Sequence, residues 1–127
     1  MSDPSHDLVW RWAEAVNRRD RDALIALSHP EIDLYPLQIA VSGHYRGHEG
    51  VARWMDDLTT DDIGHGVRLE STRTLPDGRV ALTGDVYLED RLISPYTLVV
   101  EVRDGLVARV RSYLNDEETL RALKLLR

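Results

Sequence analysis

The spacing of apolar residues changes once along the chain, and this change constrains the fold more than any other feature. Before residue 64 they recur at helical spacing, as in the stripe Leu8, Val9, Trp12, Ala13 and Val16. After residue 64 apolar and polar residues alternate, which is the period of a β-strand. Helices followed by strands favour an α+β fold, with the helices on one face of a curved, mostly antiparallel sheet.

The first two predicted helices are bounded by clear signals. One runs from about residue 5 to 18, with residues 1–5 as a loose tail. Asp20 is the expected N-cap of the second helix. That helix ends near His29, because Pro30 disfavours helix in the residue before it.

A strand, a loop and a third helix follow. Residues 32–35 predict a short strand, and residues 43–47 predict a loop. The third helix begins at Gly47 and carries four apolar residues on one side: Val51, Trp54, Met55 and Leu58.

The C-terminal half predicts strands joined by tight turns. The strands are expected at 67–72, 80–88, 96–102 and 106–114. Segments 76–79 and 104–105 contain the Pro, Asp and Gly residues that tight turns require. Asn115 and Glu118 form a capping-box pattern that opens a short C-terminal helix. We expect all 127 residues to form one domain.

Composition excludes several classes of protein. The chain has no Cys, and therefore no disulfide, thiol nucleophile or Cys-based zinc site. The formal net charge of −6 argues against binding to nucleic acid. No apolar run approaches the roughly 20 residues of a membrane helix, and residues 1–7 lack the regions of a signal peptide. We therefore expect a cytoplasmic protein with no nucleic-acid or membrane partner.

Five segments carry a resemblance to a known family. They are Trp12–Asn17, Asp20–Leu27, His29–Ile32, Tyr45–Val51 and Val102–Tyr113. In this order they resemble the SnoaL-like family of the nuclear-transport-factor-2-like superfamily, which includes ketosteroid isomerases, polyketide cyclases and limonene-epoxide hydrolases. The resemblance covers about residues 6 to 125. It implies a cone-shaped roll, in which three N-terminal helices and the C-terminal helix pack on the concave face of the sheet. Because this fold hosts many activities, it implies no single reaction.

Catalytic positions of two of these enzyme classes are changed here. The resemblance aligns Trp12, Tyr35 and Leu98 with the tyrosine, the aspartate base and the protonated acid of ketosteroid isomerases. None of the three keeps the acid or base that the reaction requires. The apolar inner faces also offer no Asp-Arg-Asp cluster of the kind that epoxide hydrolases use. The sequence therefore argues against both mechanisms.

Three residues are candidates for acid–base catalysis. Asp33 and Tyr35 lie two apart on the predicted strand and share a face, so that a carboxylate base and a phenol donor could line a pocket. The alternative is a strand edge with Asp33 in water. His65, between two glycines, could place an imidazole at the rim of the pocket, or else be a surface residue.

His44 and His48 have the spacing of two metal ligands on a helix, with Glu49 adjacent. Such ligands converge only on a continuous helix, and Gly47 marks a helix start between them. We therefore expect no metal, and we expect His48 to contact the helix N-terminus. The chain also lacks a glycine-rich phosphate loop, so the prediction includes no cofactor.

Nine residues are predicted to line an apolar pocket for a small hydrophobic molecule. They are Trp12, His44, Trp54, Met55, Tyr96, Leu98, Val100, Val110 and Ser112. Aromatic residues at helical spacing are more often core than ligand contacts, so a filled core is the alternative.

The outer face of the sheet is predicted to form a homodimer interface. Arg109, Arg111 and Tyr113 form a row on this face, together with Asp85 and Glu101. Such a mixture suits a polar two-fold interface, and it also suits a solvated surface.

The sequence thus predicts a protein that binds a small hydrophobic or polyketide-like molecule. The first hypothesis is a cofactor-independent acid–base enzyme of the isomerase, cyclase, dehydratase or hydrolase type. The alternative is a ligand-binding module without catalysis, and a third hypothesis is a dimerisation domain with a filled cone.

Overall fold

The computed structural model describes the backbone of residues 4–35, 44–60, 65–88 and 91–114. Within these ranges, the side chains of residues 60, 65, 86, 88, 92–94, 96, 113 and 114 are not described. The helix predicted after Asn115 lies outside the described residues, as do residues 1–3 of the expected tail.

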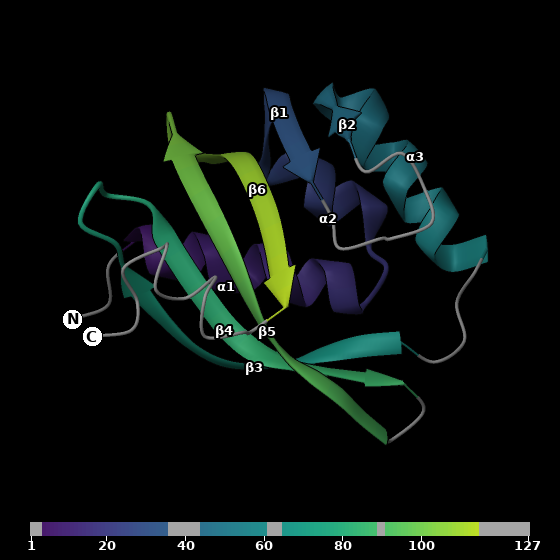
Figure 1. The fold of residues 1–127 in the computed structure, drawn as a ribbon. Coiled ribbons are helices and arrows are strands. Elements are labelled where there is room, and N and C mark those ends of the chain that lie inside the picture. The colour runs from purple at the N-terminus through teal and green to yellow at the C-terminus, as the bar shows by residue number, and fades with distance from the viewer. Residues whose placement is uncertain (1–3, 36–43, 61–64, 89–90, 115–127) are drawn as a thin grey trace.

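The described residues form three helices (Figure 1). They are α1 (Pro4–Asn17), α2 (Arg21–Ala26) and α3 (Gly47–Thr60). Asp20 caps α2 as predicted, because its side chain accepts a hydrogen bond of 3.1 Å from the backbone N–H of Ala23. α1 already begins at Pro4, which suits the first turn of a helix, and α2 ends before the expected limit at His29. None of these helices is long and apolar enough to cross a membrane.

Six strands of the described chain form one curved sheet (Figure 1). They are β1 (Ser28–Tyr35), β2 (Tyr45–Arg46), β3 (His65–Thr74), β4 (Val80–Leu88), β5 (Arg91–Arg103) and β6 (Leu106–Leu114). Their spatial order is β2-β1-β6-β5-β4-β3. The β1–β6 pair is parallel, and the other neighbours are antiparallel. The α+β prediction, with helices packed on a curved and mostly antiparallel sheet, is confirmed.

Four strands differ in extent from the prediction. β3 extends two residues beyond the expected 67–72 at each end. β2 lies within residues 43–47, which were expected to form a loop. β1 begins earlier than expected, at Ser28. β5 begins at Arg91 instead of Tyr96 and therefore includes Pro95. The β4–β5 pairing shifts register close to this proline, in keeping with the tendency of strand prolines to lie at bulges.

Both predicted turns are present. Asp104 and Gly105 have φ values of 55° and 74°, the positive angles that a two-residue hairpin turn requires. In the β3–β4 turn Gly78 has a φ of 92°, and its N–H donates to the carbonyl of Leu75 at 2.9 Å. The turn residues therefore match the backbone conformations that the sequence predicted.

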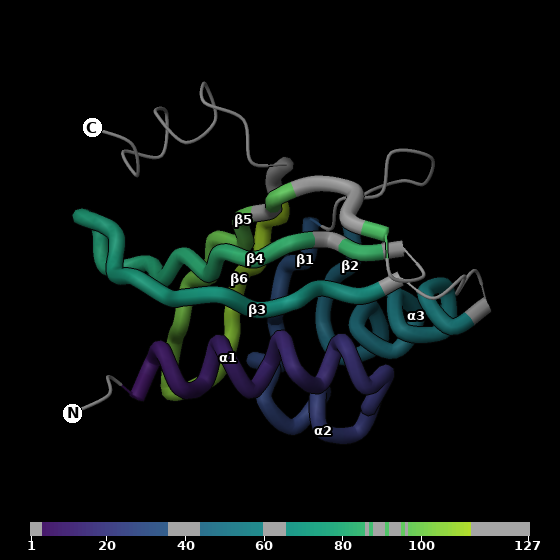
Figure 2. The backbone as a smooth tube through the Cα atoms, turned by 90° about the horizontal axis from the view of Figure 1, so that it is seen from below, coloured from purple at the N-terminus to yellow at the C-terminus, as the bar shows by residue number. Residues whose placement is uncertain are grey.

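The core lies between the helices and one face of the sheet, which we call the inner face. Figure 2 shows α1 and α2 on the same side of the sheet. Both layers contribute fully buried side chains, including Val9, Trp12, Leu24, Ile32, Leu34, Val51, Leu82, Val100 and Val107. The opposite face of the sheet is called the outer face.

An irregularity in the β5–β6 pairing interrupts the alternation of β6. Glu101 pairs with Arg109, but Val102 pairs with Val107, so that β6 holds an extra residue between them. As a result, Val107 and Ala108 are both buried. Simple alternation predicts only one of these neighbours in the core.

Candidate functional site

Two tryptophans from different helices stack in the core. The rings of Trp12 on α1 and Trp54 on α3 have centroids 5.8 Å apart and planes inclined by 19°. The indole N–H of Trp12 donates to Ser28 Oγ at 3.0 Å, and this hydroxyl donates to the carbonyl of Leu24 at 2.7 Å. Since Ser28 is itself buried, these bonds satisfy the polar groups next to Trp12.

The indole N–H of Trp54 has no such partner in the described part of the chain. Trp54 is only 8% exposed, and its Nε1 atom is buried without a hydrogen bond to any described residue. A buried donor left unpaired costs roughly 1–3 kcal/mol, because the bond it makes to water in the unfolded chain is not replaced. The core therefore contains a donor that an acceptor atom would stabilise.

Most of the residues predicted to line a pocket belong to the inner layer. Six of them are buried in one apolar cluster: Trp12, Trp54, Met55, Leu98, Val100 and Val110. Ser112 is half-buried and pairs in register with Leu98. The side chain of Tyr96 lies outside the described residues.

The C-terminal half of β1 turns its polar residues toward the outer face. Ile32 and Leu34 are 0% and 1% exposed, and both belong to the core cluster. Asp33 and Tyr35 alternate with them and therefore point away from the helices. The expectation of a carboxylate inside an apolar pocket is not met by Asp33, because the two aliphatic side chains occupy the inner positions. A catalytic role for Asp33 or Tyr35 stays a prediction.

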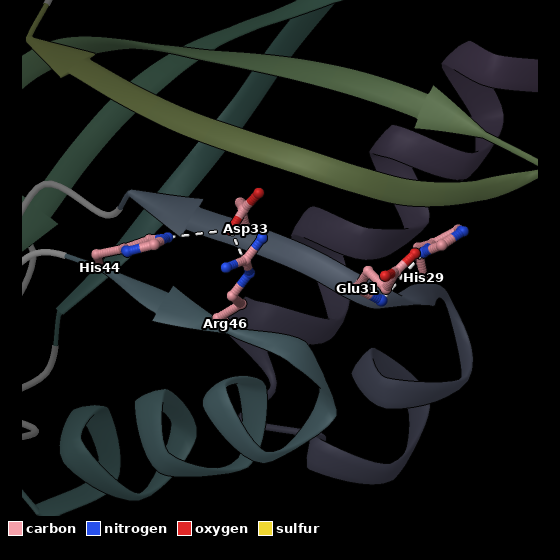
Figure 3. A network of polar contacts seen from close by, with 5 residues as sticks. All are labelled: His29, Glu31, Asp33, His44 and Arg46. Atoms are coloured by element: carbon pink, nitrogen blue, oxygen red, sulfur yellow. Dashed lines mark hydrogen bonds and ion pairs between the residues drawn. The ribbon is translucent and has the colours of Figure 1, made fainter.

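Asp33 is held by two side chains of the neighbouring segment (Figure 3). His44 Nε2 lies 3.0 Å from Asp33 Oδ1, and Arg46 Nε lies 3.4 Å from the same oxygen. Tyr35 stacks on the His44 ring, with centroids 4.5 Å apart and planes inclined by 7°. His44, predicted as a pocket residue, is thus an exposed member of an outer-face cluster.

Two arginines of β6 lie beside Tyr35 on the outer face. The guanidinium carbons of Arg111 and Arg109 are 4.6 Å and 5.6 Å from the centroid of its ring. A hydrogen bond with Tyr35 is the main cause that raises the pKa of Arg109, with smaller contributions from the charges of Asp33 and Glu101. The ring of Tyr35 therefore lies beside two cationic side chains.

His48 does not join this cluster. His48, in the first turn of α3, lies with Nε2 2.9 Å from the carbonyl oxygen of Ser28 and must donate to it. His44 and His48 therefore bind different partners. In the described ranges no three His, Cys, Asp or Glu side chains converge as a metal site would require. The side chain of His65 lies outside the described residues, although its backbone begins β3.

The homodimer stays a prediction. The charges that motivated it have neighbours of opposite sign within the chain, since Glu101 pairs in register with Arg109, and Asp85 with Arg68. Charge complementarity on the outer face is therefore available without a second copy.

A pocket on the outer face is a feature that the sequence did not predict. It encloses about 160 Å³ and is lined by Arg79, Val99, Glu101, Arg109 and Arg111. The alternation of arginines along β6 indicates a cationic row. The approach of Arg79, however, depends on the path of the β3–β4 turn, which no periodicity encodes.

Helices packed on the inner face of a curved mixed sheet define the cystatin-like class of α+β cone folds. Within that class, residues 9–110 match the model of the SnoaL-like domain, and the chain belongs to this family. No protein of curated function matches the chain.

Several solved structures share the fold. Bal32a, from a soil-derived mobile gene cassette, is 23% identical, with a TM-score of 0.73 over 87% of this chain and 88% of its own. TerC, co-crystallised with polyporic acid, is 15% identical, with a TM-score of 0.73 over 96% and 99%. A candidate ketosteroid isomerase from Kribbella flavida is 19% identical, with a TM-score of 0.70 over 89% and 78%. At these identities the likeness shows the fold alone.

Proposed function

We propose that the protein binds a small, mostly apolar organic molecule between the helices and the inner face of the sheet. The ligand carries a carbonyl or hydroxyl oxygen that accepts a hydrogen bond from the indole N–H of Trp54. The observation that carries this proposal is that this N–H is buried within the apolar core cluster and has no partner among the residues that the structure describes. Natural cores rarely leave such a donor unpaired without a reason.

The energetics and the surroundings of Trp54 support such a ligand. An acceptor oxygen would recover the roughly 1–3 kcal/mol that the unpaired donor costs, which corresponds to roughly 5- to 150-fold in affinity. Met55, in the same cluster, is unbranched and can change rotamer to admit a guest at little cost. TerC, of the same fold, has been co-crystallised with polyporic acid, which supports the proposal of an organic ligand.

Binding without catalysis is favoured over acid–base chemistry for the described interior. Asp33, Tyr35 and His44 belong to the outer-face cluster. Tyr45, the titratable member of the described core cluster, donates its hydroxyl to Asp57 at 2.6 Å. A cofactor-independent isomerase, cyclase, dehydratase or hydrolase is the second candidate, supported by membership of the SnoaL-like family.

Acetophenone and ethylbenzene test the proposal, because they have nearly the same shape and differ in a carbonyl oxygen. Calorimetric titration should show that acetophenone binds roughly tenfold more tightly. Trp54→Phe keeps an aromatic ring but removes the N–H, so this preference should disappear. Trp10→Phe, at a half-buried tryptophan of α1, is the matched control and should retain it.

Two results would overturn the proposal. One is the absence of binding by either compound, and the other is a ketone preference that survives in Trp54→Phe. Asp33→Asn separates the two candidate functions: binding should be unchanged, whereas loss of a turnover found by substrate screening would favour the enzyme.

A further inference from the structure

The pocket on the outer face is not used by the proposed interior site, and its construction indicates a ligand of its own. Two arginines of β6 form one side, Val99 and Glu101 of β5 the next, and Arg79 approaches from the β3–β4 turn. Strand register explains the juxtaposition, since Arg109 pairs with Glu101 and Arg111 with Val99. We call this site the outer pocket.

The floor of the outer pocket is apolar. Val99 is 3% exposed and clusters with Leu75 and Ala81, separately from the main core. Its neighbours Leu98 and Val100 belong to the main core, so the side chain of Val99 faces outward. A ligand seated in the outer pocket would therefore contact hydrocarbon beneath it.

The rim of the outer pocket is cationic, with three guanidinium groups against one carboxylate. Arg79 already binds Asp77 through Nε at 2.7 Å. Arg111 forms no ion pair with the residues that the structure describes, and it lies over the ring of Tyr35. No carboxylate among the described residues therefore neutralises the charge of Arg111, which can pair with an anion although the whole chain has a net charge of −6.

Tyr35 holds the guanidinium of Arg111 in place. The Arg111 guanidinium carbon is 4.6 Å from the ring centroid, and the ring itself stacks on His44 at 4.5 Å. A guanidinium that is already ordered by stacking loses less freedom when it binds a planar anion.

We propose that the outer pocket binds a small organic monocarboxylate, with its apolar body on Val99 and its carboxylate paired with Arg111. The planar fork of Arg matches the two oxygens of a carboxylate. Glu101 borders the same space and would repel a second negative charge. The apolar floor favours an organic anion over inorganic phosphate, which gains nothing from contact with hydrocarbon.

Nuclear magnetic resonance titration of the whole chain can test this proposal with three probes. Benzoate should shift the methyl signals of Val99. It should bind roughly tenfold more tightly than benzamide, which has the same shape without the charge. Benzoate should also bind more tightly than inorganic phosphate, and its affinity should fall as salt is added.

Two arginine variants locate the anion. Arg111→Gln removes the charge and keeps most of the side-chain length, and we expect benzoate to bind roughly tenfold more weakly. Arg103→Gln is the matched control, because Arg103 is exposed on β5 but does not line the outer pocket; binding should be unchanged. Circular dichroism confirms that both variants are folded.

Three results would overturn the proposal. Equal affinity for benzamide would show that charge is not recognised. Benzoate shifts at the indole N–H of Trp54, with none at Val99, would place the ligand in the interior and leave the proposed function standing. A dimer in sedimentation that Arg111→Glu dissociates, without benzoate binding, would show that a second copy covers the outer pocket.

Discussion

Gly50→Ala tests whether α3 is positioned by backbone contact with β2. Gly50 lies in the first half of α3, where alanine normally stabilises a helix by about 0.5–1 kcal/mol relative to glycine. In this structure, however, a Cβ on Gly50 would lie 2.9 Å from the carbonyl carbon of Tyr45 and 3.2 Å from its Cβ. Helix propensity would therefore raise the free energy of unfolding and the steric contact would lower it, so the net change depends on which of the two is larger.

The steric cost of the Cβ contact exceeds the gain in helix propensity, because Tyr45 has little freedom to move away. Its side chain is buried at 3% exposure, its hydroxyl donates to Asp57 at 2.6 Å, and its backbone pairs with Leu34. Overpacking against a fixed neighbour costs about 1–3 kcal/mol. Because the contact at 2.9 Å is with a backbone atom, we take the upper part of this range, about 2–3 kcal/mol. After the gain of about 0.5–1 kcal/mol in helix propensity is subtracted, we expect Gly50→Ala to lower the free energy of unfolding by about 1–2.5 kcal/mol.

Urea unfolding followed by circular dichroism measures this difference. Ala52→Gly is the matched control, since it changes helix propensity in the opposite sense at a half-buried position of α3, and it should cost about 0.5–1 kcal/mol. If Gly50→Ala instead raises the free energy of unfolding by the amount expected from propensity, the close approach of α3 and β2 is refuted.

Three further substitutions test other contacts. Gly84→Ala would bring a Cβ against a backbone carbonyl of β3, and thermal unfolding should show that the free energy of unfolding falls by about 2–3 kcal/mol. An unchanged unfolding temperature would mean that β3 can move away from the added methyl group. Ser28→Ala leaves the indole N–H of Trp12 unpaired, so urea unfolding should show a loss of about 1–3 kcal/mol, and a neutral result would contradict the buried hydrogen bond. Burial and the hydrogen bond to Asp57 raise the pKa of Tyr45 from 10.0 to about 12. The neutral phenol therefore stabilises the folded state fully below pH 10, and this stabilisation is lost as the pH approaches 12. Tyr45→Phe should abolish this alkaline loss in unfolding experiments, and an identical pH profile for both proteins would refute the assignment.

Periodicity predicted the elements that a single long pattern encodes. Four elements occupy nearly the residues expected: α1, α3, β4 and β6. Each has a continuous apolar stripe, and burial of this stripe against the core stabilises the element. β2 has only two residues, Tyr45 and Arg46, and exists because β1 offers them a partner. No local sequence pattern can predict a strand that forms only because a neighbouring strand pairs with it.

The period of two predicted correctly which face of the sheet most side chains point to. The exceptions are Val107, where β6 departs from strict alternation, and His44, which was assigned to the pocket without a periodic pattern. Arg109 and Arg111 point outward and Val110 inward, as the period of two requires. Val107 joins the core only because β6 carries an extra residue opposite Val102. The outer pocket was not predicted, because it depends on strand register as well as on alternation. The register brings Arg111 beside Val99.

The alternation of β1 also bears on whether the interior can use Asp33 as a base. A one-residue slip would bring Asp33 inward, but it would turn Ile32 and Leu34, now 0% and 1% exposed, toward the outer face. Exposing two such side chains costs about 3–6 kcal/mol, a large part of the 5–15 kcal/mol that typically stabilises a domain. The aliphatic pair thus fixes the carboxylate beside His44 and Arg46, and acid–base catalysis in the interior requires a base other than Asp33.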